Sequence, residues 1–136
     1  MNRTTNQPPS PPFDRGSNDR RFPTFGAGVF ANQPTVTTDS IGGADSDDWW
    51  AITVSYTRIG DRLPVIFNLI GANAGFEVYS QGSSLPLDRR VMPGQSPKEM
   101  ELYLVRGTYL IHVIPLSTTS VASNYRLTVK DKLAMP

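Results

Sequence analysis

Three aspartates, Asp45, Asp47 and Asp48, stand close together just before a pair of tryptophans. Carboxylate oxygens are the ligands that a hard cation such as Ca²⁺ prefers, so these residues, with Asp39 nearby, are candidate calcium ligands. Their spacing differs from that of an EF-hand, because no downstream glycine and bidentate glutamate follow. The alternative is a solvated turn whose aspartates bond to neighbouring backbone groups. We predict no required metal, and the three aspartates are the residues to mutate if calcium binds.

Catalytic chemistry has little support in the sequence. The chain has no cysteine, and its one histidine, His112, lacks the partners of a triad or a zinc site. We expect a structural or interface histidine there. The serines form no G-x-S-x-G elbow, and Gly26-Ala27-Gly28 does not open the helix of a dinucleotide site. We therefore predict no enzymatic activity and no cofactor.

The residues before Gln33 have the composition of an interface arm. Prolines and glycines are frequent and apolar residues do not alternate, so this segment cannot build a core of its own. Aromatic and arginine side chains, the usual anchors of protein interfaces, are interspersed in it. We predict that residues 1–33 form an extended arm that binds partner proteins, and the alternative is that its last phenylalanines pack on their own domain. The residues predicted to contact partners are Phe13, Phe22, Phe25, Phe30, Arg20 and Arg21, together with Trp49.

The chain after Gln33 has the pattern of an all-β domain. Apolar residues recur at every second position, as they do in a strand with one buried face. Turn residues separate these segments and no helical period occurs. The pattern predicts an antiparallel β-sandwich or jelly roll of about eight strands over residues 34–131, with 132–136 as a tail. The expected strands cover residues 35–37, 48–56, 63–70, 75–80, 89–91, 99–104, 107–114 and 124–130.

Alternation also assigns a face to each residue. Trp49 should project from the opposite face to the core, beside Ala51, where it is either covered by the arm or available to a partner. Leu110, His112 and Ile114 should extend that outward surface on another strand. The residues expected to face inward are Trp50, Ile52, Val54, Val65, Phe67, Leu69, Phe76, Val78, Met100, Leu102, Leu104, Tyr109, Ile111, Val113, Tyr125, Leu127 and Val129.

The charge and the N-terminus limit the partners and the compartment. The net charge is +1, from 13 Lys+Arg and 12 Asp+Glu, which favours neither nucleic acid nor an anionic membrane. No stretch approaches the ~20 apolar residues of a membrane span, so we expect no membrane insertion. The first residues have no apolar segment of a secretory signal. We predict a cytoplasmic protein, with an extracellular location as the alternative if a signal was removed.

An ordered series of motifs resembles the bacterial pre-peptidase C-terminal domain family. An Asp-rich turn with a D-W-x-x-I-x-V strand lies at residues 47–54, a G-T-Y-x-I-x-V strand at 107–113, and a closing Y-x-L-x-V strand at 125–129. Where many members have D-x-D-L-x-L, residues 73–78 read N-A-G-F-E-V. The resemblance implies a β-sandwich over about residues 36–130. It also implies a non-catalytic module of the kind attached to secreted peptidases or found in surface proteins, and some related collagen-binding domains bind calcium.

Two function classes follow from these patterns. The arm favours a structural linker subunit that binds other protein subunits of a larger complex through the arm and the sandwich surface. The family resemblance favours an extracellular recognition module for a polysaccharide or protein ligand.

Overall fold

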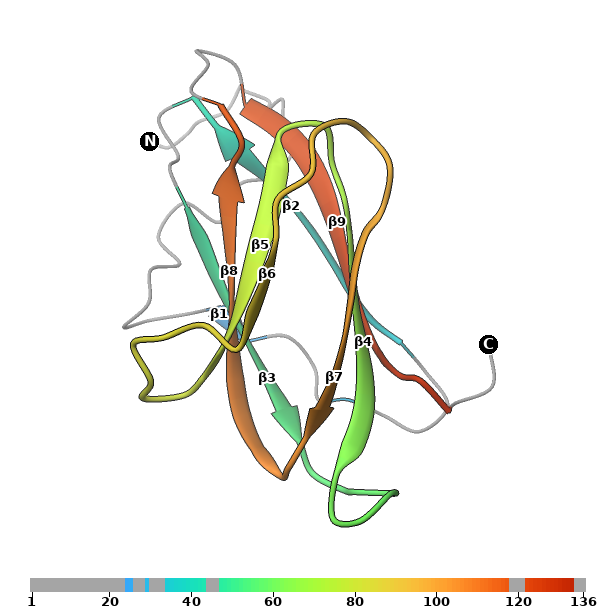
Figure 1. The fold of residues 1–136 in the computed structure, drawn as a ribbon. Coiled ribbons are helices and arrows are strands. Elements are labelled where there is room, and N and C mark those ends of the chain that lie inside the picture. Colours follow the sequence, from blue (N-terminus) through green and yellow to red (C-terminus); the bar gives the residue numbers. More distant parts are fainter. Residues whose placement is uncertain (1–23, 26–28, 30–33, 44–46, 118–121, 134–136) are drawn as a thin grey trace.

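The computed structural model describes residues 24–25, 29, 34–43, 47–117 and 122–133. These residues form an all-β sandwich of two packed sheets with no helix, which confirms the predicted fold class (Figure 1). The strands are β1 (Thr24–Phe25), β2 (Thr35–Gly42), β3 (Asp48–Val54), β4 (Leu63–Ile70), β5 (Ala74–Ser80), β6 (Asp88–Arg90), β7 (Lys98–Leu104), β8 (Gly107–Pro115) and β9 (Ala122–Asp131).

The two sheets exchange strands along the chain. One sheet has the order β1-β3-β8-β5-β6 and the other has the order β2-β9-β4-β7. All neighbouring strands are antiparallel except the short β1, which pairs parallel to β3. Because most consecutive strands lie in different sheets, residues far apart in the sequence meet across the core. No helix of the described residues is long and apolar enough to cross a membrane.

The core follows the predicted alternation. Every residue expected to face inward belongs to the buried cluster between the sheets, except Leu102, which is partly buried against it. Val29, Ile41, Leu63 and Ala74 join that cluster without having been predicted. Val29 lies within the segment expected to be an arm, yet it is 1% exposed and its N–H donates to Thr53 O at 3.0 Å.

Strand β2 is longer than expected. The sequence predicted a strand over residues 35–37 only, but β2 pairs with β9 in an unbroken register from Thr35 opposite Val129 to Gly42 opposite Ala122. Asp39 is buried in this strand, where its carboxylate accepts the N–H of Ser40 at 2.8 Å. The turn comes only at Gly42 and Gly43, whose φ angles of 107° and 64° favour glycine.

A buried lysine fixes the start of β7. Lys98 is fully buried, and its Nζ donates to the carbonyls of Gly71 at 2.9 Å and Gly94 at 2.8 Å. Burial lowers the pKa of Lys98. Because Gly71 directly follows β4, this contact ties the end of β4 to the start of β7 and so positions the outer face of that sheet.

Candidate functional site

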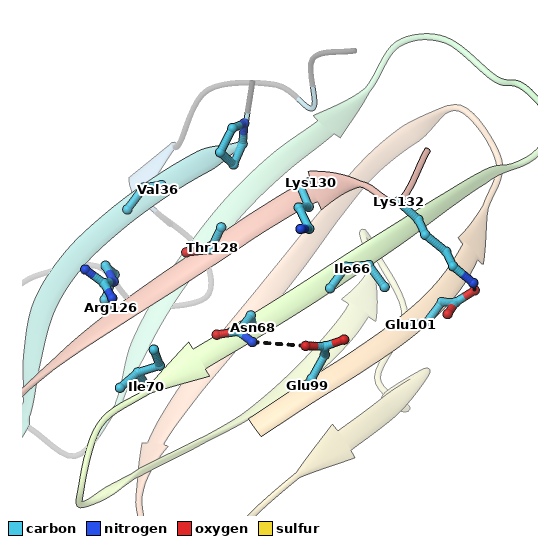
Figure 2. A pocket seen from close by; sticks show the side chains of 11 residues that line it. Val36, Ile66, Asn68, Ile70, Glu99, Glu101, Arg126, Thr128, Lys130 and Lys132 are labelled. Atoms are coloured by element: carbon cyan, nitrogen blue, oxygen red, sulfur yellow. Dashed lines mark hydrogen bonds and ion pairs between the residues drawn. The ribbon is translucent and has the colours of Figure 1, made fainter. Parts of the chain in front are cut away.

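The outer face of the sheet β2-β9-β4-β7 is hollowed. The hollow has a volume of about 620 Å³, and its side chains point away from the core on all four strands (Figure 2). Strand β4 lies between β9 and β7, and the pairing aligns the outer residues of the three strands in rows. We call this surface the groove, and its lining residues are Pro34, Val36, Ile66, Asn68, Ile70, Glu99, Glu101, Arg126, Thr128, Lys130 and Lys132.

Charges of opposite sign border the groove. The cations Arg126 and Lys130 stand on β9, whereas Glu99 and Glu101 stand on β7. Lys132 donates to Glu101 at 3.0 Å, an interaction that raises the pKa of Lys132.

Among the described residues, the two carboxylates of the groove have side-chain partners, whereas its two cations on β9 have none. The amide of Asn68 donates to Glu99 at 3.2 Å, as Figure 2 shows, and Glu101 is paired with Lys132. Among the described residues, neither Arg126 nor Lys130 forms an ion pair. The groove can therefore offer two exposed cations to a ligand.

Trp49 lies on the outer face of the other sheet, as alternation predicted. It is only 6% exposed, because it packs with Ala51, Tyr79 and Leu110 in a second apolar cluster. Its ring stacks on His112 at a centroid distance of 3.9 Å and an interplanar angle of 7°. A partner could reach little of Trp49 in this arrangement, and its role in partner binding stays a prediction.

His112 is held by its neighbours rather than aimed at a reactive group. Its Nδ1 donates to Glu77 Oε1 at 3.1 Å, and the hydroxyl of Tyr79 donates to the same oxygen at 2.9 Å. Asp47 Oδ2 lies 3.6 Å from Nε2, beyond hydrogen-bond length. Arg89 pairs with Glu77 at 3.4 Å. These contacts suit the structural histidine expected from the sequence.

Asp48 is a buried part of the core and not an exposed turn residue. It is 0% exposed, and its Oδ2 accepts the hydroxyl proton of Tyr125 at 2.7 Å. The same hydroxyl accepts from Trp50 Nε1 at 2.8 Å. Burial, followed by the Asp48 carboxylate, raises the pKa of Tyr125. Asp48 therefore joins β3 to β9 across the sandwich.

The candidate calcium residues are only partly described. Among the described residues no group of three or more His, Asp or Glu side chains is arranged to hold a metal ion. Asp47 is half-buried beside His112, and Asp48 faces Tyr125 inside the sandwich. Asp45 lies outside the described residues.

A second buried carboxylate lies at the end of β9. Asp131 is fully buried and accepts from the hydroxyl of Tyr56 at 2.9 Å and from Nε of Arg58. Burial and the hydrogen bond to Asp131 raise the pKa of Tyr56 to about 12. These contacts join the end of β9 to the segment that follows β3.

The C-terminal part of the predicted arm attaches to its own domain. Residues Thr24 and Phe25 form β1 and pair with Trp50 and Ala51 at the edge of β3. Val29 reaches the core a few residues later. The other predicted partner-binding residues, Phe13, Arg20, Arg21, Phe22 and Phe30, lie outside the described residues.

Comparisons with known proteins support the fold. No protein-family model and no curated protein matches the chain. The pre-peptidase C-terminal domain of collagenase from Bacillus anthracis is similar in structure, with a TM-score of 0.60 and 14% identity over 79% of this chain and 96% of that one. The resemblance inferred from the motifs is thus confirmed at the level of the fold.

Two periplasmic lysozyme inhibitors of g-type lysozyme are also similar. PliG of Aeromonas hydrophila has a TM-score of 0.48 and 18% identity over 78% of this chain and 94% of its own. PliG of Salmonella Typhimurium has a TM-score of 0.46 and 16% identity over 80% of this chain and 99% of its own.

The groove is the site that sequence reasoning missed. Alternation placed Arg126 and Lys130 on the outer face of their strand, because they flank the inward-facing Leu127 and Val129. It did not reveal that β2 and β4 would be the neighbours of that strand, with β7 on the far side of β4. The signal in the sequence was a pair of like charges on one face of each of two predicted strands, Glu99 with Glu101 and Arg126 with Lys130.

Proposed function

We propose that the chain is a non-catalytic binding module that recognises a polypeptide ligand in the groove of the sheet β2-β9-β4-β7. The observation that carries this proposal is the hollow of about 620 Å³, which combines apolar side chains with exposed cations. A site of this kind offers apolar contact together with a few polar groups that fix a ligand's orientation. The fold shared with the collagenase domain agrees with a module that carries no reaction of its own.

A polypeptide fits the groove better than a polysaccharide. Among the described residues, no aromatic side chain lines the hollow, so those residues offer a sugar ring no flat apolar surface on which to stack. The apolar lining comes instead from the branched side chains Val36, Ile66 and Ile70 together with Pro34. Such side chains suit contact with the aliphatic side chains of a peptide.

Selection from a random peptide library tests the proposal. The immobilised chain should enrich a family of sequences, whereas the variant Thr128→Trp, which fills the centre of the groove, should not. Urea unfolding should show that this variant is folded, because Thr128 lies on the outer face. If a glycan array gives binding that Thr128→Trp abolishes while the peptide library gives none, the ligand is a polysaccharide and the proposal is wrong.

The linker-subunit reading is a second candidate, and one observation favours it. Strand β1 stands at the edge of the five-stranded sheet, where it pairs with β3, and Val29 enters the core, so the segment that precedes β1 is joined to the sandwich at that edge. A segment anchored in this way, rich in aromatic and arginine residues, could bind neighbouring subunits. A linker subunit agrees with the predicted cytoplasmic location, whereas a recognition module agrees with the extracellular alternative.

A further inference from the structure

We infer that the groove binds an extended acidic peptide, in which two carboxylates four residues apart contact Arg126 and Lys130. This inference rests on the proposed function and names the chemistry of its ligand. The peptide follows the pattern acidic-x-apolar-x-acidic and lies along β9.

The spacing of the two cations sets the spacing of the carboxylates. Arg126 and Lys130 are both exposed and lie on the same face of β9. Four residues of a strand span about 13–14 Å, and a peptide in extended conformation has the same repeat. Side chains at positions i and i+4 of such a peptide point the same way, so both carboxylates can meet a cation at once.

The pairing of the other charges selects an acidic ligand. Glu101 is already paired with Lys132, and Glu99 already accepts from Asn68. Glu99 keeps its charge, because the amide of Asn68 is neutral, but it stands on β7 with β4 between it and the cations of β9. The three cations of the groove outnumber its two carboxylates, and the two cations without an ion pair among the described residues both stand on β9. An arginine also offers a carboxylate two parallel hydrogen bonds, which adds geometric specificity to the charge.

The middle position of the peptide meets an apolar surface. Thr128 lies midway between the two cations, and the pairing places Val36 of β2 directly beside it. Val36 is 52% exposed and lines the hollow. An apolar side chain at position i+2 would cover Val36 and the methyl group of Thr128, which favours a branched aliphatic residue there.

Fluorescence anisotropy with synthetic peptides tests the inference on the full chain. The probe is a labelled ten-residue peptide with two glutamates four positions apart and a valine midway. We expect saturable binding that weakens about tenfold in Arg126→Gln and in Lys130→Gln, and that weakens further with added salt because exposed charges are screened. Arg90→Gln, an equal change of charge at an exposed position on the other sheet, should leave binding unchanged.

Two control peptides test the geometry. A peptide with its glutamates three positions apart should bind more weakly, because its carboxylates point in opposite directions. A peptide with lysines in place of the glutamates should not bind. The charge-reversed variant Lys130→Glu should instead favour a peptide in which one glutamate is replaced by lysine.

Several outcomes would overturn the inference. The inference would be wrong if peptides with the two glutamate spacings bound with equal affinity, or if Arg90→Gln weakened binding as much as Arg126→Gln. Either result would show a general charge attraction and not a site of defined geometry. Absence of binding at peptide concentrations of ~1 mM would also overturn the inference, since an affinity below that level corresponds to less than about 4 kcal/mol. If the library selects non-acidic sequences in a Thr128-dependent way, the inference fails while the proposed function stands. If the library selects nothing, the proposed function fails as well.

Discussion

The hydroxyl of Tyr125 provides a direct test of how the two sheets are joined. It donates to the buried carboxylate of Asp48 at 2.7 Å and accepts from Trp50 Nε1 at 2.8 Å. A hydrogen bond to a charged group contributes about 1.5–3 kcal/mol and one between neutral groups about 0.5–1.5 kcal/mol. Tyr125→Phe removes both while keeping the ring, so we expect it to lower the free energy of unfolding by about 2–4 kcal/mol.

Tyr109→Phe is the matched control for this prediction. Tyr109 is 4% exposed and Tyr125 is 3% exposed, but the hydroxyl of Tyr109 makes one neutral hydrogen bond, to Val105 O at 2.7 Å. Its loss should cost about 0.5–1.5 kcal/mol. Urea unfolding of both variants measures the difference, provided that the m-values stay equal. If Tyr125→Phe loses no more stability than Tyr109→Phe, the assigned joint between the sheets is wrong.

Further predictions concern Tyr56, the candidate calcium ligands, the residues before β1, and Val29. The proton of Tyr56 should leave the unfolded chain near pH 10 and the folded chain near pH 12, so stability that is present below pH 10 should be lost between these values. Urea unfolding at several pH values should show a smaller loss of stability for Tyr56→Phe than for the wild type. Equal losses would contradict the hydrogen bond from the Tyr56 hydroxyl to Asp131. Treatment with a chelator should leave the melting temperature unchanged, whereas a drop of several degrees would indicate a calcium site at Asp45, Asp47 and Asp48. Deletion of residues 1–23 should leave the sandwich folded, as measured by circular dichroism, but abolish co-purification with partner subunits. A truncated chain that keeps every partner would contradict the linker-subunit hypothesis. Val29→Ala should lower the free energy of unfolding by about 2 kcal/mol, because Val29 belongs to the core.

The sequence predicted the interior of the sandwich well because alternation along a strand is a local property. The opposite faces of Trp49 and Trp50 followed from their adjacency alone. The burial of Trp49 could not be predicted in the same way, since Tyr79, Leu110 and His112 reach it from two other strands. Local pattern gives the face of a residue, and the pairing of strands decides what covers that face.

The aspartates before β3 show the same difference between what local pattern predicts and what strand packing decides. The sequence allowed two roles for Asp48, a metal ligand or a residue of a solvated turn, and we predicted no required metal. Its partner Tyr125 stands 77 residues later in the chain, and only the packing of β3 against β9 brings the two together. Val29 was assigned to the arm for a related reason, since the short apolar stretch that begins at Val29 shows no alternation of apolar and polar residues.

The two outer faces of the sandwich differ in how completely their polar groups are used. On the five-stranded sheet, Glu77 accepts from both His112 and Tyr79 and pairs with Arg89, and the stacked ring of Trp49 covers much of the adjoining surface. A ligand there would have to displace contacts that the domain already makes.

The four-stranded sheet has the opposite character. Its apolar side chains surround a hollow, and two of its exposed cations have no ion-pair partner among the described residues. A ligand that binds there forms new contacts and breaks few contacts within the domain, so little of its binding free energy is lost in disrupting the fold. This asymmetry is the physical reason to seek the binding partner at the groove, even though the sequence drew attention first to Trp49 and the aspartates beside it.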